Sequence, residues 1–407
     1  MKVVIVGAGH AGGSAAALLR ASGFEGEILL IGEEPVPPYQ RPPLSKAWLK
    51  GETDLDALLL RPPDYYGEHR VDLRTGVRVI AIDRAARTVG LSNGAREAYD
   101  RLILATGSKA RRLPIPGTDR PELIELRTLA DAERLKEALG PGRRLVIVGG
   151  GYVGLEAAAS ARALGAEVVL LERLDRVLKR VASEPLSAFF TERHRAAGVD
   201  LRVEVEVAAF EDGAVRLADG ERLTADAILV GVGALANDDL AREAGLDCEP
   251  GGSGGVIVDE TACTSDCAIF AIGDVSLRPV PVHDCVVRLE SVPNALEQAR
   301  QAAHAIVGRP PPAPEVPWFW SDQYDLKLQI AGLPMGADRT LLRGDPAAGR
   351  FAVFHLSGDR ILSVEAVNAP PEFMAGKQLI QRRTAVDPIR LADLTVSMKA
   401  VARDAVA

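Results

Sequence analysis

Residues 2–12, KVVIVGAGHAG, recur with few changes at residues 144–154, RLVIVGGGYVG. Each copy is a short apolar run, then three spaced glycines, then an alanine-rich stretch with helical spacing at residues 14–22 or 155–164. A second apolar run follows in each copy and ends in an acidic residue. In both copies, this order predicts a strand, a tight turn, a helix and a second strand. Two such units predict an α/β protein with two separate dinucleotide-binding domains.

The glycines of each copy stand where a dinucleotide-binding turn needs them. In Gly-x-Gly-x-x-Gly the first glycine makes the turn, the second lets a pyrophosphate approach, and the third allows the helix to pack on the strand. The pyrophosphate lies at the helix N-terminus, where the macrodipole presents roughly half a positive charge. An acidic residue about 20 positions on binds ribose hydroxyls. These assignments fall on Gly7, Gly9, Gly12 and Glu33 in the first copy and on Gly149, Gly151, Gly154 and Glu172 in the second.

The acidic residue of the second copy indicates which nicotinamide cofactor binds there. A carboxylate at the end of the second strand repels a 2′-phosphate, so Glu172 favours NADH. Arg173, its neighbour, keeps NADPH as the less favoured alternative.

The composition is that of a soluble globular protein with several domains. A chain of 407 residues exceeds one ordinary core, and 47% of it is apolar and 26% charged. A net charge of −8 argues against a nucleic-acid partner, which normally meets a basic face. No window reaches the ~18 apolar residues of a membrane span. The apolar run at residues 3–6 leads straight into glycines, so we interpret it as a strand and not a secretory leader, and expect a cytoplasmic protein.

Several further segments have recognisable patterns. Thr128 and Asp131 have the spacing of a capping box at a helix start. Residues 309–314 are a proline-rich linker, and about 90 residues after it are expected to form a small α+β domain. Strands are predicted at residues 101–107, 227–232 and 268–274, a helix at 294–307 before Gly308, a hairpin at 350–356 and 361–367, and a helix at 371–383.

Short motifs around the two units resemble the FAD- and NAD-linked reductases of the glutathione reductase type. These motifs are Ala105-Thr-Gly107 and Ala271-Ile-Gly-Asp274. Longer runs at residues 41–46, 290–299 and 317–324 are similar to the ferredoxin reductases of bacterial oxygenase systems, the putidaredoxin reductase type.

The resemblance implies a discontinuous FAD domain, an inserted NADH domain and a C-terminal α+β domain over the flavin face. We expect these domains at residues 1–110 with 239–314, 111–238 and 315–407. By the resemblance, FAD is held by Gly7, Gly9, Ala11, Gly12, Glu33, Arg41, Lys46, Val79, Ala105, Thr106, Gly107, Arg127, Gly273, Asp274, Val292 and Trp320. NADH is held by Gly149, Gly151, Tyr152, Gly154, Glu156 and Glu172.

The resemblance also implies an activity and a partner. Hydride would pass from NADH to FAD, followed by two one-electron transfers to a [2Fe-2S] ferredoxin that serves a haem monooxygenase or a Rieske dioxygenase. Lys46 and Glu156 would pair at the reaction site, and Trp320 would cover the flavin. The candidates for docking the ferredoxin are Arg300, Lys327, Lys377 and Lys399. A simpler interpretation exists for each: Lys46 and Glu156 could be a structural ion pair, Trp320 a core residue, and the four basic residues solvated surface charges. We expect the protein to be a monomer or a weak homodimer.

The cysteines point away from a sulfur relay. The chain has no cysteine before Cys248, so no redox-active thiol can stand in the first FAD segment, as it does in disulfide reductases of this fold. Cys263, Cys267, His283 and Cys285 lack the paired spacing of a metal site, so we expect no metal and ordinary buried thiols. A thiol-free NADH oxidase, a reductase of rubredoxin or of a small molecule, and a non-catalytic redox-sensing flavoprotein remain alternatives.

Overall fold

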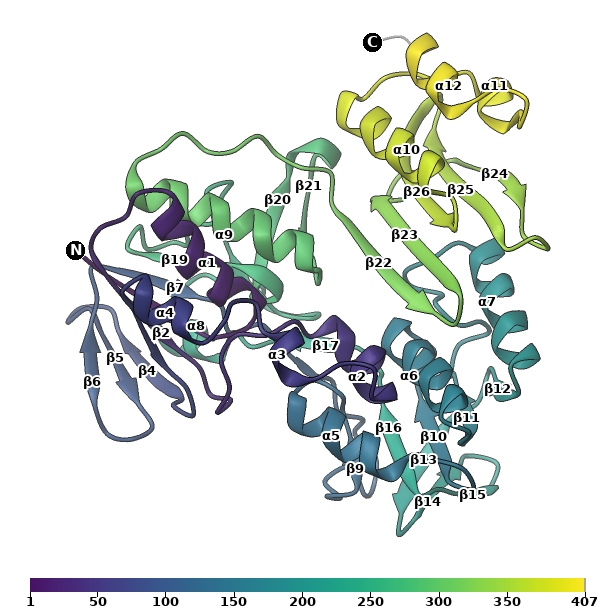
Figure 1. The fold of residues 1–407 in the computed structure, drawn as a ribbon, viewed down its shortest axis with the longest axis horizontal. Helices are drawn as coiled ribbons and strands as arrows, with labels where there is room; N and C mark the ends of the chain where they lie inside the picture. Colours follow the sequence, from purple (N-terminus) through teal and green to yellow (C-terminus); the bar gives the residue numbers. More distant parts are fainter. Residues whose placement is uncertain (406–407) are drawn as a thin grey trace. The chain divides into compact units, whose positions relative to one another are not determined.

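The computed structural model describes residues 1–405, and the chain runs back and forth between two compact units (Figure 1). The first unit contains Met1–Arg41, Leu55–Lys109 and Ala234–Pro317. The second contains Pro42–Asp54, Ala110–Gly233 and the described chain from Trp318 onward. Residues 42–54 therefore pack with the second unit, although they lie in sequence inside the first dinucleotide-binding segment.

The first unit is built on a parallel sheet of five strands. In spatial order they are β19 (Ile269–Ala271), β7 (Arg101–Leu104), β1 (Lys2–Val6), β2 (Glu27–Ile31) and β3 (Val71–Arg74). The central strand β1 is one apolar run because both of its faces are covered. Val3 and Ile5 pack in the core under the helices, and Val4 and Val6 pack in the core on the opposite face.

The helices and minor strands of the first unit surround this sheet. Helices α1 (His10–Ala21) and α9 (Val292–Val307) pack against each other over one face (Figure 1). Two small sheets are formed by β4 (Val79–Asp83), β5 (Thr88–Leu91) and β6 (Arg96–Ala98), and by β18 (Val256–Ile257), β20 (Ser276–Val280) and β21 (Cys285–Arg288). The remaining elements are α3 (Leu55–Leu58), α4 (Asp64–Glu68), α8 (Asp239–Glu243), η2 (Gly273–Val275), η3 (Pro281–His283) and the paired strands β8 (Ser108–Ala110) and β17 (Ala234–Ala236).

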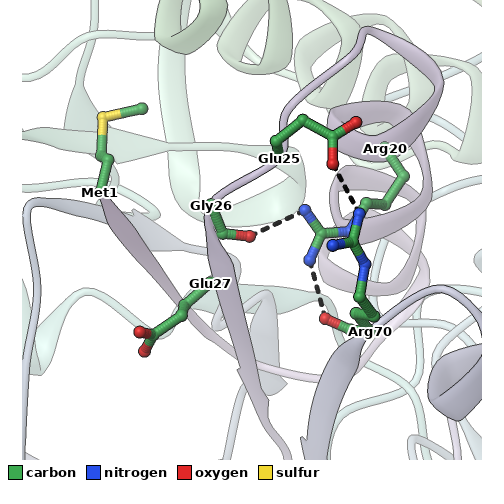
Figure 2. A pocket seen from close by; sticks show the side chains of 6 residues that line it. All are labelled: Met1, Arg20, Glu25, Gly26, Glu27 and Arg70. Carbon is green, nitrogen blue, oxygen red and sulfur yellow. Dashed lines mark hydrogen bonds and ion pairs between the residues drawn. The ribbon is translucent and has the colours of Figure 1, made fainter.

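Arg20, in the last turn of α1, connects this helix to the neighbouring loops by hydrogen bonds. Its guanidinium donates to the carbonyls of Phe24, Gly26, His69 and Arg70. Figure 2 shows this side chain in a surface hollow beside the ion pair of Arg70 with Glu25. Because backbone carbonyls take its donors, we assign Arg20 a structural role and not that of an anion-binding residue.

The second unit repeats the parallel sheet. Its strands are, in spatial order, β12 (Val199–Arg202), β11 (Glu167–Leu171), β10 (Arg144–Val148), β16 (Ala227–Val230) and β9 (Leu123–Ile124). A small antiparallel sheet of β13 (Val207–Glu211), β14 (Ala214–Leu217) and β15 (Arg222–Thr224) shares a core with β10 and β11. The helical segments are η1 (Pro42–Ser45), α2 (Ala47–Lys50), α5 (Leu129–Ala138), α6 (Tyr152–Ala163) and α7 (Glu184–Ala196).

The C-terminal part of the second unit is an antiparallel sheet with helices. The strand order is β22 (Trp318–Gln323), β23 (Leu326–Gly332), β26 (Arg360–Val367), β25 (Arg350–Ser357) and β24 (Arg339–Asp345). The helices are α10 (Pro370–Arg382), α11 (Pro388–Ala392) and α12 (Met398–Asp404). Helix α10 packs on β26 and β23. The architecture confirms the α/β class, the two dinucleotide-binding folds and the C-terminal α+β domain; the last two residues of the predicted C-terminal segment lie outside the described ones.

Local predictions are confirmed where a strong signal starts or stops an element. Thr128 accepts from the Asp131 N–H, and the Asp131 carboxylate accepts from the Thr128 N–H, so the capping box exists with aspartate. Helix α9 ends at Gly308, whose φ of +72° suits glycine.

The prediction of buried thiols is wrong. Of the three cysteines that the prediction covers, Cys267 is exposed and Cys263 and Cys285 are only half-buried. Cys248 is half-buried as well, and all four are free thiols. Cys263 and Cys248 pack against the margins of the two cores of the first unit, and Cys285 lies in the edge strand β21. Burial raises the pKa of Cys248 and of Cys263 to about 11, so both stay protonated at neutral pH.

Within residues 1–405, no cluster of three or more His, Cys, Asp or Glu side chains could hold a metal ion. In the same range, no helix is long and apolar enough to cross a membrane.

Candidate functional site

The two glycine turns have the same geometry. Gly7 has φ +107° and Gly149 has φ +113°, a region that side chains rarely adopt. A Cβ at Gly7 would collide with the carbonyl of Ala105, and one at Gly149 with the carbonyl of Gly231. Each turn therefore needs glycine for two reasons, conformation and space.

The third glycine of each motif lets the helix approach the strand. A Cβ at Gly12 would collide with the Gly7 carbonyl and would meet Ile5 Cγ2 at 3.3 Å. A Cβ at Gly154 would likewise meet Ile147 Cγ2 at 3.3 Å. Both helices are thus held with their N-termini directly over the turn.

These helix N-termini are open to a ligand. Gly9 caps α1 and Gly151 caps α6, and neither helix start has a capping side chain. A Cβ at Gly151 would find nothing within 4 Å, and one at Gly9 would find only an Arg41 nitrogen, at 4.0 Å. Helix starts leave N–H groups without intrahelical partners, and a pyrophosphate is the kind of group that they accept. Both starts therefore fit a dinucleotide.

A second set of polar groups in the first unit surrounds Gly273 and Asp274. Gly273 has φ +76° and its N–H donates to Gln298 Oε1 at 2.8 Å. The Asp274 carboxylate accepts from Ser108 Oγ at 3.0 Å. Thr106 and Asn237 exchange hydrogen bonds between side chain and backbone, which fixes the turn after β7.

Two buried nitrogens close to this segment and to the start of α1 have no hydrogen-bond partner among the described residues. They are Nε2 of Gln298, whose side chain is fully buried, and Nδ1 of His10, the first residue of α1. Burial lowers the pKa of His10, with Asp274 raising it and Arg41 lowering it to smaller extents. Buried polar atoms without a partner are rare in proteins, so their presence here fits a bound group that supplies acceptors.

The other residues assigned to FAD have varied surroundings. Arg41 pairs with Glu34 at 2.6 Å and lies over the Tyr39 ring. Glu33 is exposed after β2, 3.9 Å from Arg78. Val79 is buried in the core of the first unit, and Ala11 and Ala105 are also buried, whereas Val292 starts α9 and Arg127 precedes the α5 capping box.

In the second unit, Glu172 is built into the glycine turn. Its carboxylate accepts from the N–H of Gly150 and from that of Leu174, both at 2.8 Å. The acid at the end of β11 is thus held in one orientation beside the N-terminus of α6.

Tyr152 begins α6 and packs edge-on against Phe319 of β22, with ring centroids 4.8 Å apart. Burial, and after it the charges of Glu365 and Glu156, raise the pKa of Tyr152 well above its ordinary value, so the phenol stays protonated. Its hydroxyl donates to the Val181 carbonyl at 3.3 Å.

Lys46 and Glu156 form a buried ion pair. The Lys46 ammonium lies 2.6 Å from Glu156 Oε2, and the side chains are 16% and 7% exposed. The ammonium also donates to the Pro42 carbonyl at 3.1 Å. Ser45 Oγ donates to Glu156 Oε2 at 2.5 Å, and Ser321 Oγ donates to Oε1 at 2.6 Å. Pairing was predicted from the sequence, since a lone buried charge would cost several kcal/mol, and it is confirmed.

Strand β22 presents two different faces. Ser321 and Gln323 are buried on one face. Trp318 and Trp320 lie on the other face and are half-buried, with their ring centroids 5.7 Å apart. Trp318 also contacts Phe373, and the Lys377 ammonium lies over its ring at 5.1 Å.

The four basic docking candidates are all at least partly accessible. Arg300 pairs with Glu315 at 3.1 Å in the first unit. In the second unit, Lys327 and Lys399 are exposed, and Lys377 covers Trp318.

Sequence reasoning missed the polar side chains behind Glu156, namely Ser45, Ser321, Gln323 and His194. His194 Nε2 lies 2.9 Å from Gln323 Oε1, and Tyr324 OH lies 3.0 Å from His194 Nδ1. The alternation in Trp318–Gln323 places Ser321 and Gln323 on one strand face, which the sequence could have shown. Nothing in the sequence near His194 indicates that α7 brings it there.

Comparison with known proteins agrees with this arrangement. Residues 1–299 match the family described as pyridine nucleotide-disulphide oxidoreductase, and residues 318–402 match the reductase C-terminal family. The chain is 49% identical to the probable ferredoxin reductase CtmF of Castellaniella defragrans, over 98% of each chain. It is 44% identical to putidaredoxin reductase CamA of Pseudomonas putida, over 98% of this chain and 96% of the relative.

Solved structures are similar over the same length. The reductase in a covalent putidaredoxin reductase–putidaredoxin complex matches with a TM-score of 0.96 and 44% identity, over 99% of this chain and 98% of that one. A ferredoxin reductase for the CYP199A2 system of Rhodopseudomonas palustris matches with a TM-score of 0.93 and 38% identity, over 98% and 99%. The chain therefore belongs to the pyridine nucleotide-disulphide oxidoreductase family, among its ferredoxin reductases.

Proposed function

We propose that this protein is an FAD-dependent NADH:ferredoxin oxidoreductase. The observation that carries the proposal is the pair of matching, uncapped helix N-termini at Gly9 and Gly151, in a chain whose relatives along its full length are ferredoxin reductases. Two such helix starts provide for two dinucleotides, a resident one and an exchanging one.

The first unit would hold FAD with the turn at Gly7, the helix start at Gly9 and the segment around Asp274. The N–H groups at the start of α1 bind and orient the pyrophosphate, and Asp274 binds the ribityl chain. Gln298 Nε2 and His10 Nδ1 are two buried atoms that could donate to or accept from the bound group. Bound FAD supplies the redox chemistry, because it accepts a hydride from NADH and releases electrons singly to a ferredoxin.

The second unit would bind NADH at Gly149, Gly151, Tyr152 and Gly154. Glu172 is already oriented by two backbone N–H groups, so its remaining lone pairs can accept from ribose hydroxyls. The same negative charge repels a 2′-phosphate and supports NADH over NADPH. Lys46 and Glu156 are assigned to the hydride-transfer step, where the carboxylate fixes the position of the ammonium.

The partner would be a small [2Fe-2S] ferredoxin with an acidic surface. Its docking is assigned to Trp320, Lys327, Lys377 and Lys399 in the second unit and to Arg300 in the first. Opposite charges steer such encounters and make their rate fall with added salt. We assign the protein to the cytoplasm, as a monomer or a weak homodimer, with domains at residues 1–110 with 239–314, 111–238 and 315–407.

Acceptor choice tests this proposal. NADH-driven turnover is measured with a [2Fe-2S] ferredoxin, a rubredoxin and oxygen, one at a time. The proposal expects the ferredoxin to be reduced fastest, and more slowly as salt rises. Faster reoxidation by oxygen alone would indicate an NADH oxidase instead, and reduction of rubredoxin only would move the partner to that class.

A further inference from the structure

Behind Glu156, a buried line of polar groups runs through the second unit. Ser321 and Gln323 come from β22, His194 from α7, and Tyr324 follows β22. Gln323 Nε2 lies 3.1 Å from Ser321 Oγ, and His194 Nε2 lies 2.9 Å from Gln323 Oε1. Apart from half-buried Tyr324, these side chains are buried, so water cannot replace a lost partner.

Chemistry fixes the direction of every hydrogen bond in this line. Glu156 pairs with Lys46, so its carboxylate is ionised and can only accept hydrogen bonds. The Ser321 hydroxyl therefore donates its single hydrogen to Glu156 Oε1. Ser321 Oγ can then only accept from Gln323, which turns the amide nitrogen toward it. The amide oxygen therefore faces His194.

The same logic assigns the histidine tautomer. The Gln323 oxygen accepts from His194, so Nε2 carries the ring proton and Nδ1 accepts from the Tyr324 hydroxyl. This requires a neutral ring. Burial lowers the pKa of His194 to about 4, with the hydrogen bond to Gln323 raising it and Arg193 lowering it to smaller extents, so the ring is neutral at pH 7.

All donors thus point toward one carboxylate, from Tyr324 to Glu156. We propose that Ser321 and Gln323 are positioning residues that hold Glu156, and through it Lys46, in the orientation that hydride transfer needs. The inference rests on the proposed function, in which the Lys46–Glu156 pair serves that step. Aligned hydrogen bonds polarise one another, so a break far from Glu156 still weakens the bond at Oε1.

The strand that carries Ser321 also carries Trp320, the residue assigned to ferredoxin docking. Trp320, its neighbour, lies on the other face of the same strand and contacts Trp318. One rigid strand therefore carries both the group that orients Glu156 and the tryptophan assigned to ferredoxin docking.

Two variants with a matched control test the inference in the flavin-loaded protein. Ser321→Ala removes the donor to Oε1, and Gln323→Met keeps the size of the side chain but removes the donor to Ser321. The control is Ser363→Ala on β26, because Ser363 Oγ is equally buried but has no hydrogen-bond partner among the described residues. Flavin reduction by NADH, the Kd for NAD⁺ and the midpoint potential of the bound flavin are measured for each.

Ser321→Ala is expected to slow flavin reduction roughly tenfold, as loss of one hydrogen bond to a charged group predicts, and Gln323→Met to slow it less. The Kd for NAD⁺ changes by a smaller factor than the rate, because the glycine turn at Gly149 and the Glu172 carboxylate are untouched. The midpoint potential moves to more negative values, because Glu156 loses a donor and keeps more of its negative charge.

Rates and potentials of Ser321→Ala equal to those of Ser363→Ala would overturn the inference, and if Ser321→Ala does not fold, the same equality for Gln323→Met would do so. A wild-type protein that binds no flavin, or is not reduced by NADH, would instead remove the proposed function itself.

Discussion

The Glu156 carboxylate of α6 lies 2.6 Å from the Lys46 ammonium, although 110 positions separate the two residues in sequence. Both side chains are largely buried, and the hydroxyls of Ser45 and Ser321 donate hydrogen bonds to the two carboxylate oxygens. A charge pair of this kind stabilises the fold only as a pair, which makes it a sensitive test of the site.

Removing one member of this pair is predicted to destabilise the protein strongly. Lys46→Met leaves Glu156 buried without its cation, at a cost of about 3–5 kcal/mol in unfolding free energy. Adding Glu156→Met removes the stranded charge and restores much of the loss. Thermal unfolding of wild type, both single variants and the double variant measures this coupling. Additive losses would mean that the two charges act independently.

Asp274→Ala is predicted to purify with depleted FAD. The change removes the carboxylate assigned to the ribityl chain but leaves the glycine turn at Gly7 intact. The flavin-to-protein absorbance ratio after purification measures occupancy. Ser108→Ala is the matched control, since it removes only the serine that donates to Asp274. Full yellow occupancy of Asp274→Ala would remove its assigned role.

Glu172→Arg is predicted to lower the NADH preference by roughly tenfold or more, because a cation can accept the 2′-phosphate that the carboxylate repels. The kcat/KM ratio for NADH and NADPH measures the change. Part of the loss with NADH comes from the turn itself, since Glu172 also holds the N–H of Gly150. Glu172→Gln, which keeps the shape, separates the two effects. An unchanged ratio would contradict the specificity argument.

Trp320→Ala is predicted to slow ferredoxin reduction more than flavin reduction by NADH. The two half-reactions are followed separately by stopped flow. Trp318→Phe, on the same strand face, keeps an aromatic ring against Phe373 and serves as the control. Equal slowing of both half-reactions would place Trp320 in the nicotinamide site or in the core.

Acid is predicted to destabilise the second unit through His194. The folded pKa of about 4 lies below the ordinary value near 6.5, so the unfolded chain binds the extra proton first. Stability is therefore unaffected above pH ~6.5, falls between pH ~6.5 and ~4, and levels off below that, a loss on the order of 3 kcal/mol. His194→Gln should flatten this part of the melting-temperature profile. The same acid slope in the variant would assign the effect to other groups.

The sequence predicted those parts of the molecule that depend on local geometry. Gly7 and Gly149 are required by positive φ and by lack of space, and such requirements leave a mark in one short stretch. The Thr128 capping box is equally local. The distant contacts of the polar line were not predictable. Ser321 meets Glu156 through packing of β22 against α6, Gln323 meets His194 of α7, and neither Ser321 nor His194 carries a motif. The cysteine prediction failed since residue type alone says little about depth in a loop-rich region.

Anaerobic titration of the purified protein with NADH tests the central claim most directly. The account predicts a yellow protein whose flavin absorbance is lost with about one equivalent of NADH, because one hydride carries two electrons. Oxidised ferredoxin should then restore the colour. A colourless protein that takes up no FAD when it is offered, or a yellow one that NADH leaves oxidised, would contradict the account.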